Sequence, residues 1–452
     1  MVQTRPDINL QLTVSNRQIL KIAMPIAASI VVPQINFITN NIFLGSLGVK
    51  SLAVAGITGV YYLIFAVIGA GLNSGLQALI SRRAGENRIE EIGNLFHQGI
   101  RIALVFALAG IAITFFIAPA VLARSLHDPE NLQMALHFLY IRIWGLPFLY
   151  IYQMRNALLV GTNQSKFLVI GTLAETVVNI VLDYGLIKGH WGMPAMGFNG
   201  AAVASITAEA AGLVIIFAVM RWKGISKQLQ LFKNFQYDAT QTRLIVEQSA
   251  PLILQNAISI VTWEFFYILI EHHGELALAV SNTMRNIFGL FGCVTWAFAA
   301  TSNTMVSNII GQQQQHRVID LVWRIVRLSL GFAIVVCTLL NIAPGFFLRI
   351  YGQGDAFITA AIPVVRVVSL ALVLQSISTI WLNAVTGTGN TVINLLSESI
   401  AIIFYGLYVY LVLEVFNLSI IYGWMSEMLY WIVLFVPSFW YMMSGRWKRK
   451  II

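Results

Sequence analysis

About twelve apolar stretches, each long enough to cross a lipid bilayer, constrain the fold of this chain more than any other feature. A transmembrane helix needs roughly 20 mainly apolar residues, because the hydrocarbon core of a bilayer is about 30 Å thick. Of the 452 residues, 58% are hydrophobic and 10% are charged, which is typical of polytopic membrane proteins and not of soluble domains. The sequence therefore predicts an all-α polytopic membrane protein. The predicted spans are 17–44, 52–80, 95–122, 134–161, 167–188, 199–220, 244–271, 278–310, 321–344, 358–386, 392–415 and 419–443.

Lysine and arginine residues are distributed unevenly between the two sets of loops that join these spans. One set carries most of them, whereas the opposite set contains only Lys50, Arg124, Lys188 and Arg349. Because positively charged loops stay in the cytoplasm, we expect the rich set and both termini to be cytoplasmic, in a bacterial inner membrane. This topology also accounts for the net charge of +9, so no nucleic-acid partner is expected.

The chain repeats itself at a constant offset of 226 residues. The two halves, residues 1–221 and 244–452, each contain six spans and are joined by a predicted cytoplasmic linker, residues 222–243. Because six is even, the copies run in the same direction and are related by a pseudo-twofold axis along the membrane normal. We expect two six-helix bundles that give alternating access by rocking. Matching residues at this offset include Pro25 with Pro251, Gly48 with Gly274, Gly85 with Gly311, and Gly161 with Gly387.

One span carries three polar residues on a single helical face. Glu175, Asn179 and Asp183 are spaced at i, i+4 and i+8. A carboxylate at membrane depth costs several kcal/mol unless it is paired, hydrated or protonated. The pattern fits either a hydrogen-bonded stripe between helices or a site for a proton or Na⁺, and we favour the ion site.

Three other spans place polar residues at about the depth of Asp183. They are Asn40 in the first span, Tyr140 in the fourth and Ser205 in the sixth, aligned by the ~1.5 Å rise per helical residue. The alternative is that each bonds only to neighbouring backbone, as is common in membrane helices. We predict that they converge on Asp183.

Two further pairs have predicted structural roles. Pro25 and Pro33 interrupt hydrogen bonding in the first span, which predicts either a moving hinge or a static kink. Glu264 and Arg285 lie about ten residues on either side of a predicted turn. At equal depth they would form a structural ion pair, with a second ion site or a substrate anchor as the alternative.

At this point the residues resemble a known family, the multidrug and toxic compound extrusion (MATE) transporters of the bacterial, DinF-like type. The resemblance covers nearly the whole chain and implies two lobes around a cleft, with efflux of organic cations and other drugs coupled to inward Na⁺ or H⁺ flow. It implies a cation site at Asn179, Asp183, Tyr140, Asn156 and Ser205. This chain departs from the family at Asn40, where an aspartate is usual. The motifs that carry it are Phe43-Leu-Gly-Ser-Leu-Gly48, Leu52-Ala-Val-Ala, Arg83-Ala-Gly85, Gly161-Thr-Asn, Asn179-x-x-x-Asp183 and Asn199-Gly-Ala-Ala.

These observations predict a cation-coupled antiporter that exports drugs or other amphipathic, mainly cationic, organic compounds. We expect a monomer in the lipid bilayer, with no cofactor and no metal other than Na⁺ at Asp183. The chain contains no HExxH, GxSxG or nucleotide-binding loop, so an enzyme or an ATP-driven pump is not expected. Two alternatives are an ion channel and a flippase for an anionic, lipid-linked headgroup. A flippase would need a basic cleft, for which Arg142, Arg155 and Arg285 are the candidates.

Overall fold

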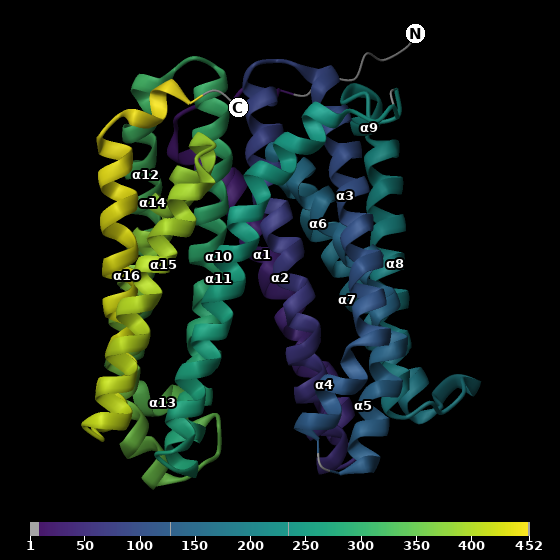
Figure 1. Ribbon diagram of the computed structural model, residues 1–452, viewed down its shortest axis with the longest axis vertical. Helices are drawn as coiled ribbons and strands as arrows, with labels where there is room; N and C mark the ends of the chain where they lie inside the picture. The colour runs from purple at the N-terminus through teal and green to yellow at the C-terminus, as the bar shows by residue number, and fades with distance from the viewer. Residues whose placement is uncertain (1–8, 127, 234, 451–452) are drawn as a thin grey trace. The chain divides into compact units, whose positions relative to one another are not determined.

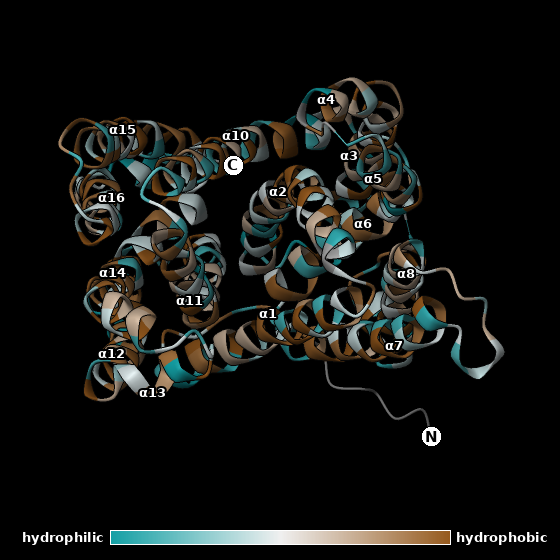
Figure 2. Ribbon diagram, turned by 90° about the horizontal axis from the view of Figure 1, so that it is seen from below, coloured by the Kyte–Doolittle hydropathy of each residue, from teal (hydrophilic) through white to brown (hydrophobic). Residues whose placement is uncertain are grey.

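A computed structural model describes residues 9–126, 128–233 and 235–450, and the regular structure within these ranges is entirely helical (Figure 1). Eleven of the described helices are long and apolar enough to cross a membrane. The remaining predicted span, 278–310, lies within α11 (Glu275–Gly311). Figure 2 shows the helices end-on, with hydrophobic residues along most of each one. The predicted all-α membrane fold is confirmed.

The helices follow one another in the same order in both halves of the chain. The first half contains α1 (Asn16–Gly45), α2 (Val49–Gly85), α3 (Ile89–Phe116), α4 (Ala118–Ser125), α5 (Pro129–Arg142), η1 (Ile143–Gly145), α6 (Leu146–Gly161), η2 (Ser165–Phe167), α7 (Leu168–Lys188), η3 (His190–Gly192), α8 (Phe198–Trp222) and α9 (Ile225–Gln228). The second half contains α10 (Ala239–Glu271), α11, η4 (Gln315–Arg317), α12 (Val318–Ile342), α13 (Pro344–Arg349), α14 (Asp355–Thr388), α15 (Thr391–Val409), η5 (Tyr410–Val415), α16 (Ile420–Met443) and η6 (Arg446–Arg449).

The helix boundaries repeat at the offset found in the sequence. Both ends of α2 and α11 differ by 226 residues, as do the last residues of α1 and α10. The first residues of α4 and α13 differ by the same number, and so do those of α5 and α14. The sequence repeat is therefore also a repeat of the secondary structure.

The two copies differ where α5 meets α6. In the second copy the corresponding helix, α14, is continuous, whereas the first copy is interrupted by η1. Pro147 lies at the start of α6 and has no backbone N–H, so it cannot bond to the carbonyl of Ile143, and Val373 occupies the matching position in α14. Arg142 is the last residue of α5, directly before this interruption, and its side chain reaches Glu209 of α8.

The described residues form two compact units. The first unit contains Ala28–Ser249, and the second contains Gln11–Ala27 together with the chain from Ala250 onward. Thus α1 begins in the second unit and ends in the first, and Pro25 and Pro33 lie on either side of that change. The division of the chain into domains at residues 222–243 stays a prediction.

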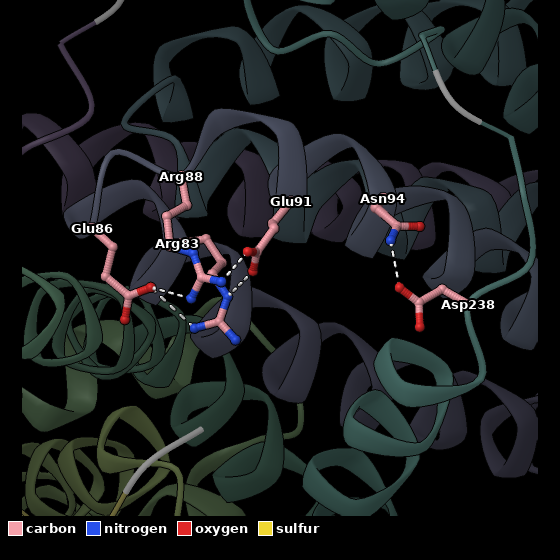
Figure 3. Close-up of polar contacts among 6 residues, drawn as sticks. All are labelled: Arg83, Glu86, Arg88, Glu91, Asn94 and Asp238. Carbon is pink, nitrogen blue, oxygen red and sulfur yellow. Dashed lines mark hydrogen bonds and ion pairs between the residues drawn. The ribbon is translucent and has the colours of Figure 1, made fainter.

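Residues 225–233 and 235–238, within the predicted linker, pack against α3 in the first unit. Lys233 Nζ lies 3.0 Å from Glu90 Oε1. The Asn94 side chain donates to Asp238 Oδ2 at 2.9 Å (Figure 3). Farther along α3, Arg101 donates to the backbone carbonyl of Phe235. The segment is therefore held on the first bundle at several points.

Charged side chains also fix the turn between α2 and α3 (Figure 3). The buried Arg83 lies 3.2 Å from Glu86 and 2.7 Å from Glu91, and Arg88 contacts the same two carboxylates. Each charge in this group has a partner of opposite sign, which lowers the cost of burying Arg83.

Candidate cation site

The centre of the candidate site is Asp183 in α7, whose side chain is fully buried. Asn179 lies one helical turn earlier, and its side-chain amide bridges two acceptors. In the orientation that satisfies both ends of the amide, its nitrogen donates to Asp183 Oδ2 at 3.0 Å and to Asn36 Oδ1 at 2.6 Å. Its oxygen lies 3.2 Å from the backbone nitrogen of Ser205. The helices α1, α7 and α8 therefore meet at this amide.

One oxygen of Asp183 is left without a partner. Among the described residues, Asp183 Oδ1 is buried and accepts no hydrogen bond. Buried polar atoms are nearly always hydrogen-bonded, and an orphan of this kind indicates strain, a functional role, or an unseen water or ion. A proton or a cation at Oδ1 would complete the environment of this carboxylate.

Two glycines of α8 allow it to approach α7 closely enough for this contact. A Cβ atom on Gly200 would lie 2.7 Å from the carbonyl oxygen of Leu186, and one on Gly212 would lie 3.0 Å from Glu175 Cβ. Small residues at such positions let helix backbones pack tightly in membranes. Ser205 lies between the two glycines, which explains why α8 reaches Asn179.

The structure brings together only some of the residues expected at this site. Asn36, one turn before Asn40, supplies the contact from α1. Asn36 was not among the residues predicted from the sequence. Asn40 and Asn156 each have a side-chain oxygen that is buried without a hydrogen-bond partner among the described residues. The ring of Tyr140 stacks on Phe115 with centroids 4.8 Å apart. Roles for these three in ion binding stay predictions.

Glu175 belongs to a separate group of charges in the same unit, in which Arg155 and Glu209 are buried and Glu175 and Arg142 are partly buried. Arg142 contacts both oxygens of Glu209, at 2.5 and 3.1 Å, and its guanidinium lies 4.0 Å from the centroid of the Tyr62 ring. Arg155 is fully buried over the ring of Tyr152, at 4.2 Å.

Glu175, in α7, adds a second acidic side chain to this group. Two arginines and two glutamates therefore balance within this bundle. Glycines leave room for them, since a Cβ on Gly145 would lie 2.2 Å from Arg142 Nη1, and one on Gly171 would lie 2.7 Å from Arg155 Nη1. The sequence places four ionisable residues, Arg142, Arg155, Glu175 and Glu209, inside predicted spans, and this pattern could have revealed the group.

The predicted pair of Glu264 and Arg285 is not formed in the part of the chain that the structure describes. The ion pairs found there include neither residue. Arg285 instead lies over the ring of Tyr267, 5.2 Å from its centroid. The predicted ion pair was wrong because equal depth on two helices does not fix the direction in which each side chain points.

A match to a protein-family model shows which family the chain belongs to. The family model described as MatE matches two segments, residues 25–185 and 251–412, whose starting points differ by the repeat offset. Together these segments cover more than half of the chain. The chain belongs to the MatE family. Since members of this family are transport proteins, the chain is a multi-pass membrane transporter and not an enzyme.

Relatives and solved structures agree with MatE membership. A probable multidrug resistance protein NorM of Thermotoga maritima is 21% identical over 438 residues, which covers 96% of this chain and 94% of that protein. Another, from Synechocystis, is 27% identical over 221 residues, and the match spans only about half of its length, 48%. A structure described as the outward-facing conformation of a multidrug resistance MATE family transporter has a TM-score of 0.87 at 16% identity, with 97% of each chain covered.

A second solved structure has the same fold. It is described as a MOP superfamily transporter from Pyrococcus furiosus whose reversed pocket polarity suggests a different function. It has a TM-score of 0.85 at 16% identity and covers 99% of this chain and 98% of that one. These likenesses confirm the twelve-helix, two-bundle fold.

The second MatE repeat has two buried glutamates, Glu398 and Glu427, with uncharged partners. Tyr430 donates to Glu398 Oε1 at 2.6 Å, and Trp263 donates to Glu427 Oε1 at 3.2 Å. At the repeat offset, Trp381 replaces Arg155, so an arginine of the first copy has an apolar counterpart. Neither glutamate forms an ion pair among the described residues, in contrast to Glu209.

Proposed function

We propose that this chain is a cation-coupled antiporter that exports drugs or other amphipathic organic compounds by alternating access. The single observation that supports this most strongly is the buried carboxylate of Asp183, with one oxygen bonded to Asn179 and the other without a partner in the described part of the chain. A charged group in such a place is expensive to maintain without a function.

The coupling ion in this proposal is monovalent. Asp183 is the only carboxylate among the described residues that bond to the Asn179 amide, so one positive charge neutralises the group. A divalent cation would leave a net positive charge buried, which is costly. H⁺ on Oδ1, or Na⁺ held by the oxygens of Asp183, Asn36 and Ser205, both satisfy this requirement.

Coupling to shape change runs through α1. When the ion neutralises Asp183, the carboxylate attracts the Asn179 side-chain N–H groups less strongly. The hydrogen bond from Asn179 to Asn36 is then favoured over the one to Asp183. Asn36 lies on α1, which like α10 belongs to both units and which carries Pro25 and Pro33. A small change at Asp183 therefore biases the bend of α1 and, with it, access to the transported compound.

The proposed substrate class rests on the relatives. The proteins of Thermotoga maritima and Synechocystis carry the name of a multidrug resistance protein, and so does the MdtK protein of Photorhabdus laumondii. We infer a small, amphipathic and mainly cationic substrate, a monomeric transporter without a cofactor, and a bacterial inner membrane location with both termini cytoplasmic.

Transport in proteoliposomes tests the proposal. With Na⁺ and H⁺ gradients imposed separately, one of them should drive export of a cationic dye, and Asp183→Asn should abolish the driven component. Asp355→Asn changes an exposed carboxylate in the first turn of α14 and serves as the matched control. Full gradient-driven export by Asp183→Asn would refute the role of Asp183.

A flippase for an anionic headgroup is less well supported. It needs arginines that are free to bind the headgroup. Arg142 is paired with Glu209, and Arg155 is fully buried. This leaves Arg285 as the one exposed member of the three predicted candidates.

A further inference from the structure

A groove runs between α15 and α16 in the second unit, at the end where α15 begins and α16 ends. Its volume is about 570 Å³, within the roughly 300–1,000 Å³ of typical small-molecule sites. Each helix contributes residues spaced at helical intervals along one face. The groove is lined by Asn390, Ile393, Leu396, Ser397 and Ile400 near α15, by Pro437, Trp440 and Tyr441 of α16, and by Arg446, Arg449 and Lys450.

The mouth of the groove is strongly basic. Arg446, Arg449 and Lys450 all line it, and no acidic side chain does. None of these three residues takes part in the ion pairs found within the described ranges. Their charges are therefore available to an anion.

The basic segment is fixed in place over the groove. Trp447, in the middle of η6, is buried and donates its indole N–H to the carbonyl of Met442 at 2.7 Å. The Arg446 guanidinium lies 5.2 Å from the centroid of the Trp440 ring. This short helix therefore presents its cations from an anchored position.

The part of the groove farther from η6 is apolar and extends along α15 toward the membrane interior. Ile400 lies nine residues after Thr391, the first residue of α15, which places it about 14 Å along the helix axis. Leu396 is 53% exposed and Trp440 is 60% exposed, so the groove opens onto the apolar outer face of α15 and α16. A ligand that fills it must be charged at one end and apolar at the other.

We propose that this groove binds an anionic phospholipid from the adjacent leaflet. The phosphodiester contacts Arg446, Arg449 and Lys450, and an acyl chain lies along Ile393 and Ile400. Basic pockets between helices at a membrane surface have the right chemistry for such headgroups, and Trp440 sits where aromatic residues contact the interface. A free phosphate would leave the apolar wall unused, and a cationic drug would be repelled.

The inference is independent of the ion site. If the termini are cytoplasmic, the groove faces the inner leaflet, where anionic lipids attract basic segments. Each lysine or arginine near such a surface strengthens the affinity for anionic lipid by about fivefold. Three of them should therefore give a preference of about 100-fold for anionic over zwitterionic lipid.

Native mass spectrometry of the delipidated full-length protein tests this proposal. Phosphatidylglycerol and phosphatidylcholine with the same acyl chains are added in turn. We expect retained adducts with phosphatidylglycerol, and loss of that preference in the triple variant Arg446→Gln, Arg449→Gln, Lys450→Gln. A matched control, Arg221→Gln, Lys223→Gln, Lys227→Gln, removes three cations near the end of α8, the first-unit counterpart of α16, and should keep the preference.

Two further measurements distinguish the ligand. Ile400→Trp fills the apolar part while keeping every cation, so it should also weaken phosphatidylglycerol binding. Millimolar inorganic phosphate should not displace the lipid. Equal binding of the two lipids, an unchanged preference in the triple variant, or displacement by inorganic phosphate would each overturn the proposal.

Discussion

At the scale of single residues, the balance of buried charges distinguishes the two kinds of site in the first unit. Asp183 has an uncharged partner, Asn179, and one oxygen to which no described residue bonds, whereas Glu209 is matched by Arg142. A matched pair stabilises one structure, while an unmatched carboxylate can respond to an ion. We therefore propose that Asp183, and not Glu175, is the charge that responds to an ion.

We predict that Arg142→Leu lowers the free energy of unfolding by about 3–5 kcal/mol, because it leaves Glu209 buried without its cation. The double variant Arg142→Leu, Glu209→Leu should recover most of this loss, since neither charge then remains. Thermal unfolding in detergent measures both. If the double variant were less stable than Arg142→Leu alone, the pair would not account for the effect.

At the scale of helices, close packing of α7 and α8 positions Asn179 and Asp183, the centre of the candidate cation site. The backbones approach at Gly200, where an added Cβ would lie 2.7 Å from the Leu186 carbonyl oxygen. The partner atom is backbone and cannot swing away as a flexible side chain would. Tight packing there determines which α8 residue faces Asn179.

Gly200→Ala should therefore lower stability by about 1–3 kcal/mol, the usual cost of overpacking, and should reduce gradient-driven transport as well. Gly406→Ala in α15 is the matched control, because no atom lies within 4 Å of the added Cβ. Alanine is also the better helix former, so this control should be neutral or slightly stabilising. Thermal unfolding and dye export report the two effects, and equal behaviour of the two variants would contradict the packing argument.

At the scale of the whole molecule, helices and a docked segment join the repeats in different ways. The helices α1 and α10 each belong to both units, whereas residues 225–233 and 235–238 are held on α3 of the first unit. Motion between the repeats is thus expected in α1, near Pro25 and Pro33, and in α10, near Pro251, rather than in this docked segment.

Asp238 secures that segment, because its side chain accepts from Asn94 and from the first backbone N–H groups of α10, those of Thr240 and Gln241, each of the latter at 3.0 Å. Asp238→Ala should cost about 1 kcal/mol through loss of the helix cap. It should also speed tryptic cleavage at Lys227 and Lys233, because local opening becomes easier. Asp320→Ala, an exposed site on α12, is the control, and an unchanged cleavage rate in Asp238→Ala would show that other contacts hold the segment.

The sequence alone determined the helical spans, their repeat at 226 residues, and the polar face of Asn179 and Asp183. These follow from the apolar length needed to cross a bilayer and from helical periodicity, both of which are local properties. Only the tertiary structure decided that Asn36 rather than Asn40 meets Asn179, and that Arg285 turns toward Tyr267 rather than Glu264. Residues one turn apart share a face and differ in depth by only about 6 Å, so the choice between them depends on how neighbouring helices are rotated and packed.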